Sequence, residues 1–173
     1  MTTLPIIIAP DPRLNEVAER VKAVDDQIRK IVEDLFETMY ANSGAGLAAT
    51  QVGINKRILV IGLPKSMDET EPKYAVINPE ITYMSEEQWT VQEGCLSFPI
   101  EERFEIARPA HIKVKFLDQN GLEHEVSASG WLARAFEHEI DHLNGVTMVH
   151  YVSKIRRDMV LKKLIKYKKE MRL

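Results

Sequence analysis

Apolar residues recur at helical spacing between Asp25 and Asn42, which predicts an amphipathic helix. The residues that share this spacing are Ile28, Ile31, Leu35 and Met39. Either Asp25 or Asp26 can accept the first free backbone N–H groups and cap the start of the helix. The glycine-punctuated loop NSGAG follows and is expected to end the helix.

The middle of the chain carries the alternation of apolar and polar residues that is typical of strands. Short strands are expected at 57–61 and 74–77, with the polar loop LPKSMDETEPK between them. In the run HIKVKFLDQNGLEHEVSA, which starts at His111, isoleucine, valine and phenylalanine alternate with lysines. Asn120 and Gly121 supply turn residues, so this run predicts a β-hairpin.

A second helix is expected from about Trp131 to Asn144, with Ser129 as its cap and Gly145 as its stop. A third helix is expected from Ser153 onward. Because the strands lie between terminal helices without regular βαβ alternation, the order favours an α+β fold over a doubly wound nucleotide-binding fold. We expect antiparallel sheets packed around a central buried helix, with an N-terminal and a C-terminal helix.

An α-helix turns by about 100° per residue, so the side chains of the helix predicted near residues 131–144 fall into separate stripes along it. Two histidines share one stripe with Trp131 and Ala135. The core stripe beside it holds Leu132, Phe136, Ile140 and Leu143, with Glu139 on the border. The residues expected to point elsewhere are Ala133, Arg134, Glu137 and Asp141. Such an apolar helix takes two imidazoles and a carboxylate into the interior, where buried polar groups need partners. A cation would satisfy all three.

The bulk composition indicates an ordinary globular domain that spans residues 1–173. A net charge of −3 argues against general nucleic-acid binding, DNA included. The chain has no apolar run near the roughly 20 residues of a membrane span, and its first residues lack the pattern of a secretory signal. With Cys95 as the single cysteine no internal disulfide can form, so we expect a cytoplasmic protein.

The charge is concentrated at the C-terminal end. Residues 154–173 hold nine Lys or Arg against two acids, a balance of +7 that leaves −10 on the rest of the chain. An apolar stripe lies under this cationic face at Val160, Leu164, Tyr167 and Met171. One interpretation is a solvated helix packed on the domain. The other is docking on an acidic surface such as ribosomal RNA.

The sequence HEIDH places His138 and His142 one helical turn apart around Glu139, the spacing of a metal-binding pair. A metzincin would supply a third histidine at position 148, which is Met148, and a thermolysin-type site would need a glutamate near 161–167, where there is none. The third ligand must then lie upstream. Cys95 in QEGCLSFP is one candidate, although most lone cysteines are buried structural residues, and the residues alone leave this open.

Three segments together resemble the peptide deformylase family. They are GAGLAATQ (44–51), EGCLS (93–97) and HEIDH (138–142), in that order. The N-terminal APDPRL and the pair Arg108-Pro109 resemble the family too, so the likeness spans nearly the whole chain. The departures are Ala45 for a branched aliphatic, Thr50 for proline, Glu137 for glutamine, and Thr147-Met148 for a Leu-Phe pair.

The resemblance implies removal of the N-formyl group from the initiator methionine of nascent polypeptides, with release of formate. It implies one divalent metal held by Cys95, His138 and His142, a donor set that suits Fe²⁺, Zn²⁺, Ni²⁺ or Co²⁺. The resemblance favours Fe²⁺. Three ligands leave one position for water, whose pKa the cation lowers so that hydroxide attacks the formyl carbonyl. Glu139 is then the general base and acid.

The resemblance also implies contacts with the substrate. Gln51, through its amide, and Leu96, through its backbone N–H, would donate hydrogen bonds to the oxyanion. An extended peptide would pair along Gly44, Ala45 and Gly46 and near Gly94. Trp131, Ala135 and Val91 are candidates for the methionine pocket, although core packing explains each equally well. Glu93 is expected to pair with Arg108 and brace the cysteine segment.

Three functions remain distinct at this point. The first is a monomeric deformylase that acts on N-formylmethionyl peptides, with a ribosome contact through residues 154–173. The second is an H-E-x-x-H peptidase that cuts internal amide bonds, which the missing downstream ligands disfavour. The third is a metal-binding module without catalysis, whose fourth ligand would come from His111, His124 or His150.

Overall fold

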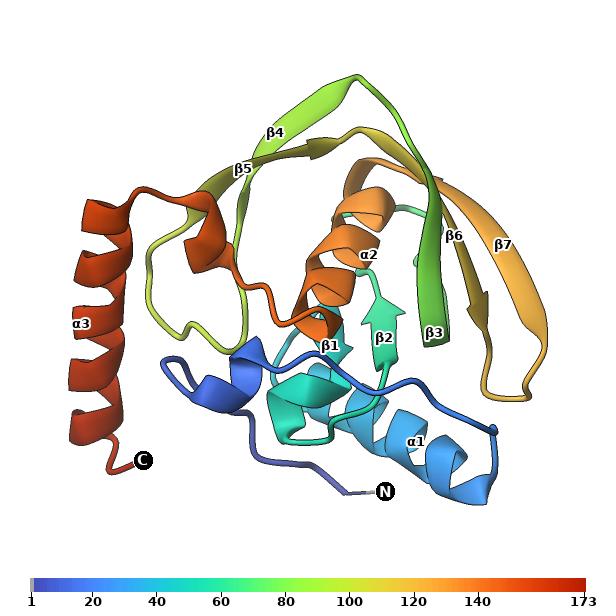
Figure 1. Ribbon diagram of the computed structural model, residues 1–173, viewed down its shortest axis with the longest axis horizontal. Coiled ribbons are helices and arrows are strands. Elements are labelled where there is room, and N and C mark those ends of the chain that lie inside the picture. Colours follow the sequence, from blue (N-terminus) through green and yellow to red (C-terminus); the bar gives the residue numbers. More distant parts are fainter. Residues whose placement is uncertain (1) are drawn as a thin grey trace.

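The structure is a computed structural model that describes residues 2–173. Antiparallel strands and three α-helices make an α+β fold, as expected (Figure 1). The helices are α1 (Asp26–Ala41), α2 (Gly130–Leu143) and α3 (Lys154–Glu170). The strands are β1 (Gly46–Ala48), β2 (Ile58–Gly62), β3 (Lys73–Met84), β4 (Gln88–Glu93), β5 (Phe104–Pro109), β6 (His111–Leu117) and β7 (Glu123–Ser129). None of the described helices is both long and apolar enough to cross a membrane.

The strands form a five-stranded antiparallel sheet and a separate hairpin. The sheet has the order β1-β2-β3-β6-β7, and β4 pairs with β5 alone. In the hairpin Glu93 is opposite Phe104 and Gln88 is opposite Pro109. The hairpin joins the end of β3 to the start of β6, so it arches away from the sheet beside α2 (Figure 1).

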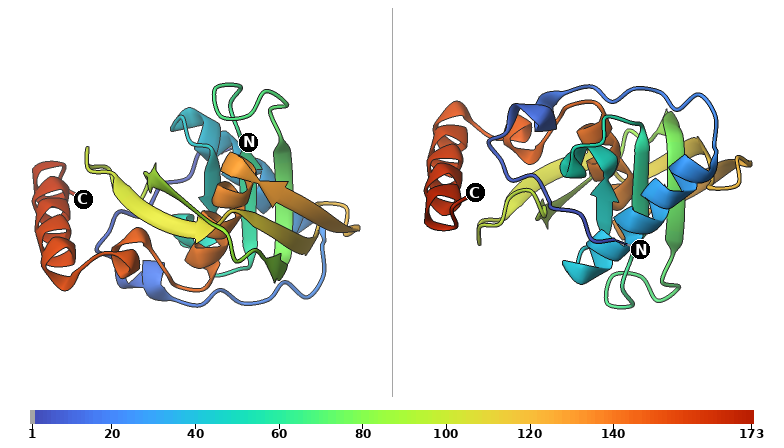
Figure 2. Two further views of the ribbon diagram at one scale, coloured as in Figure 1. Left: turned by 90° about the horizontal axis from the view of Figure 1, so that it is seen from above. Right: turned by 90° about the horizontal axis from the view of Figure 1, so that it is seen from below.

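Strand β2 separates two layers of the core. Its five residues are all buried, and alternate side chains of a strand point to opposite faces. Leu59 and Ile61 pack in one cluster with Phe136 and Ile140 of α2. The intervening residues Ile58 and Val60 pack with Leu35 and other apolar residues of α1. Helices α1 and α2 therefore cover opposite faces of the sheet at β2 (Figure 2).

A third apolar cluster attaches the C-terminal helix. Val160 and Leu164 of α3 are fully buried among residues of the N-terminal segment, the β4–β5 region and the turn before α3. The residues from these other segments include Ile7, Leu14, Phe98, Phe104 and Met148. Of the stripe predicted for this helix, Met171 is instead 57% exposed. Helix α3 thus lies at one side of the molecule and is held by a narrow apolar face (Figures 1 and 2).

Most elements with strong periodicity form where the sequence predicts them. Asp25 caps α1 by accepting the backbone N–H of Ile28 at 3.0 Å. The predicted hairpin is β6–β7, and Gly121 takes a positive φ of 78° in its turn. Ser129 stands at the start of α2 without a capping side-chain bond. The strand expected at 74–77 extends to Met84, and β1, β4 and β5 were not predicted at all.

The prediction that Ala133, Arg134 and Glu137 point away from the interior was wrong. These side chains are 1%, 4% and 5% exposed. The unpredicted β4–β5 hairpin covers this side of α2. Arg134 donates hydrogen bonds to the backbone oxygens of Ile106 and Trp89 in this hairpin. Helix α2 therefore has three buried sides rather than two.

Candidate metal centre

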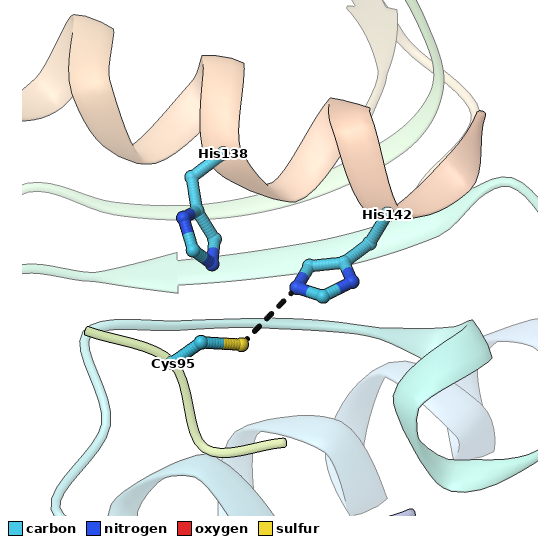
Figure 3. Close-up of side chains that lie close together, drawn as sticks. All are labelled: Cys95, His138 and His142. Atoms are coloured by element: carbon cyan, nitrogen blue, oxygen red, sulfur yellow. Dashed lines mark hydrogen bonds between the residues drawn. The ribbon is translucent and has the colours of Figure 1, made fainter. Parts of the chain in front are cut away.

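Three side chains that can ligate a metal face one another beside α2. His138 and His142 project from successive turns of the helix, and Cys95 lies two residues beyond the end of β4 (Figure 3). The Cys95 sulfur is 3.3 Å from His142 Nε2, and the potential ligand atoms of all three residues lie within 4.8 Å of one another. Within residues 2–173, no other group of His, Cys, Asp and Glu side chains is this compact.

The environment of His142 fits a metal ligand. The side chain is 1% exposed, and its Nε2 faces the Cys95 sulfur at 3.3 Å. Burial, followed by the neighbouring His138, holds the pKa of His142 well below its usual value. A neutral imidazole is the form that binds metal. One thiolate and two imidazoles are a donor set for divalent transition metals.

Glu93 is the group that fixes the orientation of His138. Its Oε1 accepts a hydrogen bond from His138 Nδ1 at 2.7 Å, so the other ring nitrogen faces Cys95 and the pocket. Arg108 donates to both oxygens of Glu93, at 2.7 and 3.0 Å, which confirms the predicted pair, and Arg134 donates at 2.6 Å. Burial alone would raise the pKa of Glu93, but the bonds from His138 and Arg108 hold it far below its usual value. A carboxylate behind a histidine of this kind sets the tautomer and makes the ring a better ligand.

Arg108 extends this polar network to the other end of α2. Its Nη1 donates to Asp141 Oδ2 at 2.7 Å, and the Tyr151 hydroxyl donates to the same oxygen at 2.5 Å. The guanidinium also lies 4.8 Å from the centre of the Tyr151 ring. The sequence reasoning missed Arg134, Asp141 and Tyr151. A charged residue inside an apolar helix, as Arg134 is, was the signal that could have revealed the network.

Glu139 lies between the candidate ligands and the residues of β1. The residue is 5% exposed, and Oε1 is 4.0 Å from His138 Nε2. Burial raises the pKa of its carboxyl group to about 7. A side chain at Gly46 would place its Cβ only 2.8 Å from Glu139 Oε1, so the carboxylate would have to move to accommodate it. Burial of this kind disfavours the charged form of a carboxyl group.

Gln51 is buried next to the cysteine. Its Oε1 accepts the Ala48 backbone N–H at 2.9 Å, which turns Nε2 toward Ser97 Oγ at 3.1 Å and Cys95 Sγ at 3.5 Å. An amide donor therefore lies beside the candidate ligands. Leu96 follows the cysteine and packs so closely on Gly44 that a Cβ there would lie 2.8 Å from its methyl group.

A pocket of about 640 Å³ opens over these groups. The predicted site residues that line it are Gly44, Ala45, Gly46, Gln51, Gly94, Cys95, Leu96, Trp131, Ala135, His138 and Glu139. Val91 is not among the lining residues and pairs with Ile106 in the hairpin. Trp131 packs edge-on against Trp89, with ring centres 5.1 Å apart. The sequence reasoning did not predict the outer lining, which includes Tyr40, Leu63, Pro64, Met67, Ile100 and Arg103.

The three remaining histidines have other neighbours. His111 lies 3.5 Å from Glu87, His124 lies 2.6 Å from Asp118, and His150 contacts Thr147. None of them belongs to the compact ligand group. The alternative of a closed site with a fourth histidine therefore has no support in the described residues.

The chain matches known proteins over nearly its whole length. The family model described as polypeptide deformylase matches residues 3–158. The peptide deformylase of Wolbachia pipientis wMel is 48% identical over 176 residues, 98% of each chain. The crystal structure of peptide deformylase from Ehrlichia chaffeensis superimposes with a TM-score of 0.94 at 44% identity, over 99% of this chain and 100% of that chain. A second structure of that enzyme, in complex with actinonin, gives 0.92 at 46% identity over the whole of both chains.

Proposed function

The chain belongs to the polypeptide deformylase family, and on that premise we propose that it removes the N-formyl group from the initiator methionine of nascent polypeptides. One observation supports this most strongly. A cysteine sulfur and two imidazoles face one another beneath an open pocket, and a buried carboxyl group lies beside them. Three protein ligands with an accessible pocket are typical of a catalytic rather than a structural metal site.

In this proposal Cys95, His138 and His142 hold one divalent cation. The bound cation supplies Lewis acidity, which lowers the pKa of water and stabilises negative charge on oxygen. Glu93 holds His138 in the ligating tautomer, and the buried helix α2 sets the spacing of the two histidines. The donor set suits several metals, and the resemblance to the family favours Fe²⁺.

Glu139 moves the proton. Its carboxylate takes a proton from the attacking water and then returns it to the amine nitrogen as the formyl C–N bond breaks. Formate and a free N-terminal methionine are the products. A general base and acid of this kind typically contributes about 10²–10⁴ in rate.

Two donors stabilise the oxyanion that forms on the formyl carbon. The Gln51 amide lies 3.5 Å from the Cys95 sulfur, and the Leu96 backbone N–H follows the cysteine directly. Loss of one such donor typically costs about 2.7–4 kcal/mol of transition-state stabilisation.

The substrate peptide runs along the glycine-rich walls of the pocket. Gly44, Ala45, Gly46 and Gly94 all line the pocket, and a glycine lets a peptide backbone approach closely. Trp131 and Ala135 line the part of the pocket next to His138 and take the methionine side chain. An indole ring suits a thioether, because sulfur–aromatic contacts are favourable.

The test is formate release from formyl-Met-Ala-Ser by the metal-loaded protein, alongside Glu139→Gln. We expect the wild type to release formate and Glu139→Gln to keep its metal while kcat falls about 10²–10⁴-fold. Unformylated and internally cleavable peptides are the controls, and they should remain intact. Cleavage of internal bonds without formate release would instead favour the peptidase.

The basic face of α3 supports a second part of the proposal, a contact with ribosomal RNA. Exposed cations include Lys154, Arg156, Lys162, Lys163, Lys166 and Lys169. We propose that the chain acts as one monomeric metallohydrolase domain in the cytoplasm and meets nascent chains through this face. Co-sedimentation with ribosomes should fall as salt rises, because phosphate contacts release counterions. Equal sedimentation at low and high salt would contradict the contact.

A further inference from the structure

The connection between β4 and β5 links the candidate ligand Cys95 to helix α3. It covers residues 94–103, and Figure 1 shows it reaching from the hairpin toward α3. Ile100 and Arg103, in its second half, line the pocket together with Cys95. The Ile100 N–H donates to the Phe98 carbonyl at 2.8 Å, which is a bond within the connection and does not attach it to the rest of the molecule. Other contacts must therefore hold residues 100–103 in place.

Two cations of α3 supply polar contacts to this connection. Arg156 Nη2 donates to the backbone oxygen of Arg103 at 2.8 Å, and its guanidinium lies 5.2 Å from the centre of the Phe104 ring. Lys163 forms an ion pair with Glu102. Residues seven apart lie on the same face of an α-helix, two turns from each other. Arg156 and Lys163 therefore contact adjacent residues of the connection from one face of α3.

An apolar contact lies between these two cations. Val160 is fully buried and belongs to the same apolar cluster as Ile100 and Phe104. It follows Arg156 by four residues and precedes Lys163 by three, so all three side chains share one face of the helix. Apolar packing is not directional. The hydrogen bond and the ion pair are what specify which residues of the connection meet α3.

Arg103 carries this contact on to the candidate metal centre. Its guanidinium lies across Gly94, so closely that a Cβ at Gly94 would overlap Arg103 Nη1. Gly94 directly precedes Cys95, and all three residues line the pocket. Arg156 does not line the pocket itself, but it fixes the backbone from which the Arg103 side chain reaches the pocket wall.

We infer that Arg156 and Lys163 are positioning residues, which hold residues 100–103 as a preorganised wall of the pocket for the substrate peptide. This role rests on the proposed function, which brings the peptide into that pocket. A wall that is already ordered in the free protein does not have to be ordered during binding, so the peptide binds more tightly. The two cations contact neither α2 nor Cys95, where the proposed chemistry takes place. We therefore expect their effect on KM and not on kcat.

This role divides the cations of α3 into two groups. Lys162 and Lys166 project from another side of the helix, because they fall roughly 80–120° from Arg156 at about 100° per residue. Both are exposed, and Lys166 lies 3.9 Å from Glu170 of its own helix. They remain free for the proposed RNA contact, whereas Arg156 and Lys163 are engaged within the protein. Lys162 and Lys166 thus provide a matched control from the same helix.

The experiment measures KM and kcat for formyl-Met-Ala-Ser on the metal-loaded wild type, Arg156→Gln, Lys163→Gln and the double variant. Exposed polar pairs contribute a factor of at most about five, so we expect KM to rise about threefold in each single variant and about tenfold in the double variant. The kcat should stay within about twofold of the wild type. The control Lys162→Gln/Lys166→Gln should keep the wild-type KM. The inference is overturned if the Arg156/Lys163 double variant keeps the wild-type KM, or if the control raises KM equally.

Exchange of the two charges tests whether the ion pair itself positions the wall. Glu102→Lys and Lys163→Glu each bring like charges together and should raise KM at least as much as Lys163→Gln does. The combined variant restores an ion pair of reversed polarity, so KM should return to within about twofold of the wild type. A combined variant whose KM is as high as that of the single variants would exclude the role of Lys163.

Hydrogen exchange separates this role from the proposed function. If the wild type releases no formate from any peptide, the proposed function fails. Amide exchange of residues 100–103, followed by mass spectrometry on the metal-loaded protein, then tests the positioning role alone. Faster exchange there in the Arg156/Lys163 double variant than in the wild type and the control, with α2 unchanged, supports the role, because it shows local opening of the wall. Equal exchange in all three proteins excludes it.

Discussion

Helices α2 and α3 are similar in length but differ in what they bury. Nine of the 14 residues of α2 are buried, and five of those nine are polar or charged. Only Val160 and Leu164 are buried in the 17 residues of α3. Arg134 and His138 of α2 pair with Glu93 of the β4–β5 hairpin, whereas most cations of α3 are exposed to solvent. Buried ion pairs fix the position of α2 against the hairpin, whereas α3 is attached through a narrow apolar stripe.

The largest expected effect follows from breaking the network behind α2. Glu93→Gln leaves Arg108 and Arg134 without their shared carboxylate in a buried site. Removing one partner of a buried ion pair typically costs about 3–5 kcal/mol. We expect chemical denaturation to show a loss of that size, and metal analysis to show weaker retention because His138 loses its orienting partner. Asp158→Asn on exposed α3 is the control and should change neither quantity.

A smaller loss is expected from the apolar stripe of α3. Leu164→Ala creates a cavity at a fully buried position and should lower the unfolding free energy by about 2–5 kcal/mol, toward the lower end because α3 can shift to fill it. Metal content and formate release per folded molecule should stay at the wild-type level. Loss of metal in this variant would show that α3 supports the metal centre as well.

A gain in stability is expected at Glu137. Both carboxylate oxygens are buried without partners, and burial raises the pKa of the group to about 7. Because the pKa of this carboxyl group is higher in the folded than in the unfolded state, the free energy of unfolding falls as the pH rises from about 4.5 to 7. Glu137→Gln cannot ionise, so thermal unfolding should show a gain of a few degrees at pH 8 and little at pH 5. The same gain at both values would contradict burial of the charge.

The smallest effect is expected on the exposed face of α3. Replacing Lys162, Lys166 and Lys169 by Gln should change the unfolding free energy by no more than about 0.5 kcal/mol at each position. Formate release from short peptides should not change, whereas ribosome co-sedimentation should weaken. A large loss of stability would mean that α3 depends on these cations for its position.

Elements with a periodic pattern of their own were predicted from the sequence, and those without one were not. Periodicity located α1, α2, α3 and the β6–β7 hairpin, because each carries an amphipathic or alternating pattern of its own. The β4–β5 hairpin was not predicted as such, because the charged Arg108 occupies a buried position of β5 and interrupts the alternation of apolar and polar residues. His138 and His142 are visible as a local spacing, one helical turn apart.

Contacts distant in sequence were harder to predict. Cys95 lies 47 residues before His142, so no periodicity joins them. The residues alone made Cys95 one open candidate, and the resemblance to the family is what favoured it. The burial of Arg134 and Glu137 was not predicted for the same reason, because it depends on the β4–β5 hairpin. Trp89 of this hairpin, which accepts a hydrogen bond from Arg134, lies more than 40 residues before it in the sequence. The outer lining of the pocket combines the end of α1 with the loop after β2, and periodicity alone does not bring these two segments together.

The central claim is that one sulfur and two imidazoles hold a catalytic cation beside Glu139. The most direct measurement determines metal content and formate release together for the wild type, Cys95→Ala and Glu139→Gln. The account predicts one metal per chain and activity in the wild type, loss of both in Cys95→Ala, and full metal content with kcat lowered about 10²–10⁴-fold in Glu139→Gln. A Cys95→Ala protein that keeps its metal and still releases formate at the wild-type rate would contradict it.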